Sequence, residues 1–202
     1  MYRFKVFILF LFCLTVAFGQ EQERIIRFHS DITMDTDGRI EVTEHIKVFA
    51  AGKEIRRGII REIPLSRKDH TGKQVRMKYK ILAVQHNGRD SWYETEKEAG
   101  NTVINLGNQY DLLDRGEHEF TIIYESYGQV GFFDGYDELY WNVTGNNSIF
   151  FVEEASATIT LPEGAQVVQT DCYTGVRGAT EKACTVEEDG EDSIEKLYFE
   201  KK

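Results

Sequence analysis

The chain has 202 residues and is acidic, with 24 Lys and Arg against 34 Asp and Glu and a formal net charge of −10 at pH 7. This balance disfavours nucleic acid as a partner, because binding to phosphates depends on clustered positive charge. The sequence has no HExxH, P-loop, GxGxxG or GxSxG motif, so it gives no motif for zinc proteolysis, nucleotide binding or serine hydrolysis.

The first 19 residues have the organisation of a secretory signal peptide. Arg3 and Lys5 form a positively charged start, Val6–Phe18 is almost wholly apolar, and Gly19 ends the run at a site that suits signal peptidase. The apolar run is shorter than the roughly 20 residues that a membrane span needs. We therefore predict an exported, extracytoplasmic protein, periplasmic or at the cell surface, whose mature part is a single domain over residues 20–202.

Alternation of apolar and polar residues dominates the rest of the chain, which is typical of strands with one solvated face. In Ile40–Ala50 the even positions are apolar except Glu44, and the turn Asp35–Gly38 lets Arg24–Met34 pair with it as a hairpin. Further strands are predicted at residues 75–83, 91–96, 102–106, 118–126, 151–161, 167–168 and 197–199.

Helical periodicity is nearly absent. The segment 54–63 fits either one short helix or an extended loop, and Pro64 ends it in both cases. Strands that recur at these spacings predict an all-β fold. We expect an antiparallel β-sandwich of immunoglobulin-like two-sheet architecture, with at most that one short helix.

Basic residues gather between residues 53 and 80, a segment that contains ten Lys or Arg and only three Asp or Glu. One interpretation is a basic face that binds anionic lipid or an acidic polymer. Its contact residues would be Arg56, Arg57, Arg61 and Arg67. The other interpretation is an ordinary solvated surface that the protein's own acids partly balance.

An acidic and aromatic stretch follows in residues 132–151. Asp134, Asp137 and Glu138 could act as an acid/base pair or as weak calcium ligands, or they could simply form a solvated turn. Tyr140 and Trp141 are predicted to fill the core between two sheets, since large aromatics supply much of the buried area of a β core.

Smaller sequence features carry further predictions. Asn142 and Asn146 begin formal glycosylation sequons, although Asn-rich turns spell such sequons by chance. Cys172 and Cys184 would form a disulfide in an oxidising compartment, worth about 3 kcal/mol of stability. Zinc binding is disfavoured because there is no CxxC and no paired histidine nearby, and no cofactor is predicted.

Several stretches together resemble a known family. These are "RRGIIREIP", "GEHEFTIIYES", "YDELYWNVTGNN", "ATITLPEGA" and "CYTGVRGATEKAC", in this order after an N-terminal signal. The order is similar to that in the family of predicted membrane proteins catalogued as domain of unknown function 2207. The resemblance implies an extracytoplasmic β-rich domain followed by membrane-spanning helices, without an established activity. The chain stops at Lys202, directly after its last predicted strand, so we expect it to be truncated relative to the family; a chain that truly ended there would be secreted.

Two functions from different classes remain open on these grounds. The first is a non-catalytic module of the cell envelope that binds a protein or an envelope component, attached to the membrane through a region beyond this chain. The second is a carbohydrate-active or calcium-dependent enzyme that uses Asp134, Asp137 and Glu138. The lack of a catalytic motif favours the first, so we predict that the chain is not an enzyme.

Overall fold

The computed structural model describes residues 21–69, 71–145, 148–175, 181–188 and 193–200. The predicted signal peptide and Asn146 lie outside these residues. Within the described part the chain forms strands and no helix, which confirms the all-β prediction. No helix in that part is long and apolar enough to cross a membrane.

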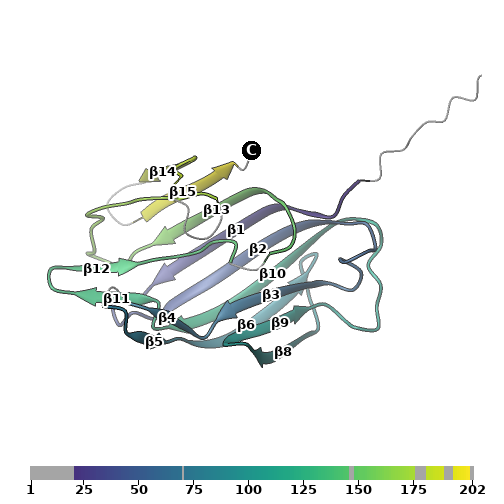
Figure 1. Cartoon of the computed structure of the whole chain (residues 1–202), viewed down its shortest axis with the longest axis horizontal. Coiled ribbons are helices and arrows are strands. Elements are labelled where there is room, and N and C mark those ends of the chain that lie inside the picture. The colour runs from purple at the N-terminus through teal and green to yellow at the C-terminus, as the bar shows by residue number, and fades with distance from the viewer. Residues whose placement is uncertain (1–20, 70, 146–147, 176–180, 189–192, 201–202) are drawn as a thin grey trace, which may run out of the picture.

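One large sheet of eight strands organises the molecule (Figure 1). Its order is β14–β15–β13–β1–β2–β10–β6–β7. The bounds are β1 (Arg24–Met34), β2 (Ile40–Ala50), β6 (Lys78–His86), β7 (Arg89–Asp90), β10 (Gly116–Tyr127), β13 (Val152–Thr160), β14 (Cys184–Glu188) and β15 (Ser193–Glu200). The pairing is antiparallel except between β1 and β13, which run parallel, so the sheet departs from the fully antiparallel prediction at this one pair.

Smaller sheets complete the fold. A three-stranded sheet has the order β3–β9–β8, and β4–β5 and β11–β12 are two-stranded. Their bounds are β3 (Ile59–Pro64), β4 (Ser66–Lys68), β5 (Gln74–Arg76), β8 (Tyr93–Glu98), β9 (Asn101–Leu106), β11 (Val130–Phe133) and β12 (Tyr136–Leu139). In Figure 1 the sheet of β3, β9 and β8 lies in front of the β10 and β6 part of the large sheet.

The core lies between the large sheet and the three-stranded sheet. Phe28, Ile46 and Phe120 occupy matching positions on β1, β2 and β10 and are at most 2% exposed. They belong to one apolar cluster with Ile104 and Leu106 of β9. Burial of such side chains against a second layer is the main force that holds a sandwich together.

One alternative is decided, and two predictions need correction. The segment 54–63 contains no helix, so of its two predicted forms the extended one is present, and its second half is β3. Residues 167–168 lie outside any strand. Tyr140 is 70% exposed, whereas Trp141 is half-buried and packs against the core. Neighbouring side chains of an extended chain point to opposite sides, so only one of two adjacent aromatics can face the core.

Candidate functional site

A buried ion pair joins the two layers of the core. Arg61 of β3 donates from Nε to Glu44 Oε2 (2.7 Å) and from Nη2 to Glu44 Oε1 (2.8 Å). Tyr124 of β10 donates its hydroxyl to the same Oε1 (2.8 Å). Glu44 is fully buried and Arg61 is 8% exposed. The pair explains why Glu44 interrupts the apolar face of its strand: a buried carboxylate requires such partners.

The same guanidinium holds the segment that follows Trp141. Arg61 Nη1 donates to the carbonyl oxygen of Thr144 (3.3 Å), and Nη2 lies 3.5 Å from that of Val143. Gly145 makes this approach possible, because a Cβ atom there would lie 2.3 Å from Nη1. Arg61 also stacks over the Phe28 ring, with Cζ 5.1 Å from its centroid.

The network fixes the charge states of its members. Burial alone would lower the pKa of Arg61, but the Coulombic attraction of Glu44 and its hydrogen bonds outweigh this, so the pKa is raised. Burial raises the pKa of Tyr79 to about 12, and burial with the Glu44 charge raises that of Tyr124 well above its ordinary value. Both phenols therefore stay neutral near neutral pH and act in the network as hydrogen-bonding groups.

Two glycines bring the start of β3 against the end of β9. Gly58 has φ +144°, and a Cβ atom there would lie 1.8 Å from the carbonyl oxygen of Leu106. Gly107 has φ +129°, and its Cβ would lie 2.1 Å from the carbonyl oxygen of Arg57. Only glycine, which has no Cβ atom, allows this approach. The two glycines therefore set the position of Arg56 and Arg57, which directly precede Gly58.

A hollow of about 380 Å³ opens beside this junction, on the outer face of the three-stranded sheet. We call it the outer hollow. Exposed Arg56 and Arg57 line it, together with Trp92 (61% exposed) and Ile60 (67% exposed). Glu54, Glu94, Asn105 and Gln109 contribute polar groups. In the described part of the chain no carboxylate lies within ion-pairing distance of either arginine.

A second depression, of about 240 Å³, lies on the inner side of β3 and is called the inner groove. Phe28 and Ile46 of the large sheet line it together with Ile149 and Phe150, and Arg61, Glu62, Thr144 and Ser148 add polar groups. Ile149 is 78% exposed. Both depressions share Glu54, Gly58, Ile59 and Ile60, so the first half of β3 separates them.

Glu23 fixes the loop that precedes the two arginines. Its Oε1 accepts hydrogen bonds from the N–H groups of Ala51 (3.0 Å) and Lys53 (2.9 Å). Its Oε2 accepts from Glu54 (2.7 Å) and Ile55 (3.1 Å). Burial would raise the pKa of Glu23, but these four hydrogen bonds outweigh it and lower the pKa. The sequence contains no local signal for this contact, because the partners are about 30 residues apart.

The structure divides the four arginines of the predicted basic face. Arg56 and Arg57 meet at the outer hollow. Arg67 is half-buried and donates from Nε to the carbonyl oxygen of Gly128 (2.9 Å). Arg61 is in the core, so its assignment to an exposed face was wrong. Sequence reasoning missed Trp92, whose position beside Arg56 and Arg57 arises from tertiary packing.

The three carboxylates of the alternative enzyme lie on one exposed hairpin. Asp134 is in the β11–β12 turn, and Asp137 and Glu138 are consecutive residues of β12, paired with Phe132 and Gly131. Consecutive strand residues point to opposite faces. Among the described residues no group of three or more His, Cys, Asp or Glu side chains is arranged to hold a metal ion.

A row of polar side chains joins β13 and β1 on the face of the large sheet opposite Phe28. Ser156 Oγ lies 2.7 Å from His29 Nδ1, and His29 Nε2 lies 3.1 Å from Asp31 Oδ1. This order of Ser, His and Asp is that of a hydrolase triad. However, Ser156 is 4% exposed in the middle of β13, so its hydroxyl is not accessible to a substrate. The row is a hydrogen-bond chain that joins β13 and β1.

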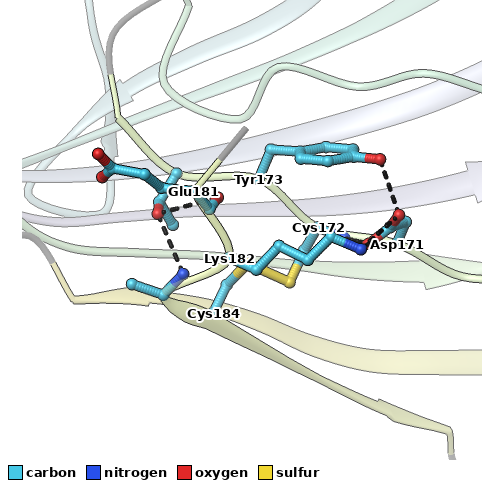
Figure 2. The surroundings of a disulfide bond; sticks show 8 residues. Asp171, Cys172, Tyr173, Glu181, Lys182 and Cys184 are labelled. Atoms are coloured by element: carbon cyan, nitrogen blue, oxygen red, sulfur yellow. Dashed lines mark hydrogen bonds and ion pairs between the residues drawn. A yellow bond between two sulfur atoms is a disulfide. The ribbon is translucent and has the colours of Figure 1, made fainter. Parts of the chain in front are cut away.

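Figure 2 shows the disulfide between Cys172 and Cys184, whose Cα atoms are 6.2 Å apart. Around it Lys182 donates to Asp171 Oδ2 (2.9 Å), and so does the hydroxyl of Tyr173 (2.7 Å). The hydrogen bond from Lys182, with that from Tyr173, lowers the pKa of Asp171. These contacts are exposed, and they brace the loop that leads into β14.

The fold and the site define an all-β domain with a hollow on the outer face of its three-stranded sheet. The chain belongs to the family described as "Predicted membrane protein (DUF2207) N-terminal domain", which matches residues 24–196. This confirms the resemblance seen in the sequence. The chain is also similar to the uncharacterized protein YciQ of Escherichia coli (strain K12), with 26% identity over 182 residues. The alignment covers 89% of this chain and 29% of that protein, so the chain spans less than a third of this relative.

Solved structures with a similar fold include two hydrolase structures. One is of native yeast LTA4 hydrolase, and the other is of native leukotriene A4 hydrolase from Saccharomyces cerevisiae. Their TM-scores are 0.52 and 0.51, with 9% and 8% identity. Each match covers 87% of this chain, and 26% or 27% of the hydrolase chain. Likeness at this identity concerns the fold alone.

Proposed function

We propose that the chain is a non-catalytic, extracytoplasmic binding module of a membrane protein, and that the outer hollow is its binding site for a protein or an envelope component. The observation that carries this proposal is the placement of Arg56 and Arg57 beside the exposed ring of Trp92. Arginine and tryptophan dominate the energetics of many protein interfaces, where a flat ring and a fork of donors work side by side.

Other observations support the location and the class. The signal-like first 19 residues and the disulfide fit an oxidising compartment outside the cytoplasm. The family description supports attachment to a membrane through a further part of the protein. The burial of Ser156 and the neutral phenols of Tyr79 and Tyr124 favour binding over catalysis.

Photo-cross-linking in the producing cell tests the proposal. A photoreactive residue replaces Gln109, which lines the outer hollow, in the full-length protein. We expect discrete adducts that disappear when Arg56→Gln and Arg57→Gln are combined. The same adducts should persist when Asp137→Asn and Glu138→Gln are combined, because the β12 carboxylates lie outside the outer hollow. Adducts that are indifferent to the arginine changes would contradict this site.

A further inference from the structure

We infer that the partner presents an extended peptide segment that adds as a strand to the open edge of β3 and carries alternating acidic and apolar side chains. This inference rests on the proposed function, since the outer hollow forms half of the docking surface. Addition of a strand to an exposed edge combines backbone hydrogen bonds with pockets for alternate side chains. The described residues offer both at β3.

The hydrogen-bond pattern identifies which groups of β3 face the open edge. Among the residues that the structure describes, β3 has a neighbouring strand on one side only, β9. The N–H of Leu65 donates to the carbonyl oxygen of Gly100 (2.9 Å), which continues the β3–β9 ladder by one pair. In an antiparallel ladder the bonded pairs alternate. Ile59, Arg61 and Ile63 therefore direct their backbone groups to β9, and Ile60 directs its N–H and C=O to the open edge.

Pro64 agrees with this assignment. It has the same parity as Ile60, so its missing N–H also belongs to the open edge and no ladder bond is lost. Further along the edge, the carbonyl oxygen of Glu62 accepts a hydrogen bond from Arg61 Nη1 (3.4 Å). The position that is open for an added strand is thus the one around Ile60.

The two depressions suit the alternation of an added strand. The side chain of Ile60 faces the outer hollow with Asn105, its partner on β9. Phe28 and Ile46 lie on the opposite side of the three-stranded sheet and line the inner groove. Consecutive side chains of a strand point to opposite faces. One residue of the partner would therefore enter the outer hollow, and the next would enter the inner groove.

The lining of each depression indicates the chemistry of the partner. Arg56 and Arg57 have no ion-pair partner in the described part of the chain, and their planar forks match a carboxylate. Glu54 and Glu94 offset part of the local positive charge, so recognition depends on direct contact rather than on long-range attraction. The inner groove has apolar lining residues on the large sheet, Phe28 and Ile46, and in the segment after Trp141, Ile149 and Phe150, which suits an apolar side chain such as that of Val.

Peptide titration with the chain tests the inference. Trp141→Phe leaves Trp92, at the outer hollow, as the sole tryptophan and hence as a fluorescence reporter. The probe is an acetylated and amidated peptide of alternating Glu and Val, six residues long. Two peptides of the same length serve for comparison. One alternates Lys and Val, and the other, the block peptide, has three Glu followed by three Val. We expect saturable binding of the alternating acidic peptide, about tenfold tighter than that of either comparison peptide.

A backbone variant isolates the edge. Ile60→Pro removes the N–H that faces the open edge without removing a bond of the β9 ladder, as Pro64 already does, and it also shortens the side chain. Ile60→Val is the matched control that shortens the side chain and keeps the N–H. We expect binding to be lost in Ile60→Pro and kept in Ile60→Val, with both proteins shown to be folded by circular dichroism. Should Ile60→Pro fail to fold, the alternating peptide with N-methyl groups on all its backbone amides replaces it, and this peptide should bind at least about tenfold more weakly.

The outcomes separate this inference from the proposed function. Equal binding of the block peptide, or unchanged binding after loss of the edge N–H, overturns strand addition while the outer hollow stands as a site. Failure of all three peptides, together with Trp92 quenching by glycan fragments of the envelope, also overturns strand addition and leaves the module a binder of another class. Cross-linked adducts that form equally well after Arg56→Gln and Arg57→Gln are combined overturn both proposals.

Discussion

At the scale of single residues, the Glu44–Arg61 pair connects the two layers of the core and the segment after Trp141. A buried ion pair has a large desolvation cost, which its hydrogen bonds offset only when all its groups are satisfied. Here the guanidinium meets a carboxylate in two hydrogen bonds and also contacts two carbonyl oxygens. Loss of one partner leaves the other charge buried alone.

We predict that Arg61→Met lowers the free energy of unfolding by about 3–5 kcal/mol, because it leaves the buried carboxyl group of Glu44 without its cationic partner. The combination of Arg61→Met with Glu44→Leu should cost less than the two single changes together, since no isolated charge remains. Urea denaturation measures each variant, with Arg89→Met, an exposed residue of β7, as the control. Strictly additive costs would contradict the coupling.

Glu23 yields a prediction with a pH dependence. Its pKa is lowered from 4.5 in the folded state by hydrogen bonds from four N–H groups, which oppose the rise that burial alone would cause. A lowered carboxyl pKa stabilises the fold above the unfolded value, and that stability is lost as the pH falls. Glu23→Gln should cost about 1 kcal/mol at pH 7, and the difference from the wild type should shrink towards pH 3. Chemical denaturation across this range checks it; a constant difference would contradict the role of the charge.

At the scale of elements, alternation placed β1 and β2 with their observed bounds, because both strands have one buried and one solvated face. The alternation of apolar and polar residues did not identify β3, because the inner face of this strand carries Arg61 between Ile59 and Ile63. The predicted strand over residues 75–83 became β5 and β6, separated by Met77, whose N–H donates to Leu65 (2.9 Å). Pairing partners thus decide where a strand breaks.

The disulfide belongs to the same scale, because it closes the loop before β14. Combined Cys172→Ala and Cys184→Ala should lower the free energy of unfolding by about 3 kcal/mol, since the separation of 12 residues makes the closed loop short. Denaturation without reductant measures the loss, and the wild type in reductant should match the double variant. A much smaller loss would mean that this loop unfolds separately from the core.

At the scale of the whole molecule, the arrangement of acidic residues leads to a prediction about calcium. Asp134, Asp137 and Glu138 are spread over both faces of the β11–β12 hairpin. A ligand that binds only the folded state raises the melting temperature. We therefore expect thermal unfolding curves in calcium and in chelator to coincide. A higher melting temperature in calcium, abolished by Asp137→Asn, would support the alternative function, a calcium-dependent enzyme.

The sequence by itself determined the all-β class, the disulfide partners and the family, because alternation, cysteine count and short motifs are local properties of the chain. The split among the four arginines came only from the tertiary structure. Arg61 is buried because Glu44, 17 residues earlier, faces it across the core. Arg56 and Arg57 meet Trp92 because Gly58 and Gly107 let two backbones touch. Contacts between residues distant in sequence depend on how layers stack, and no local pattern records that.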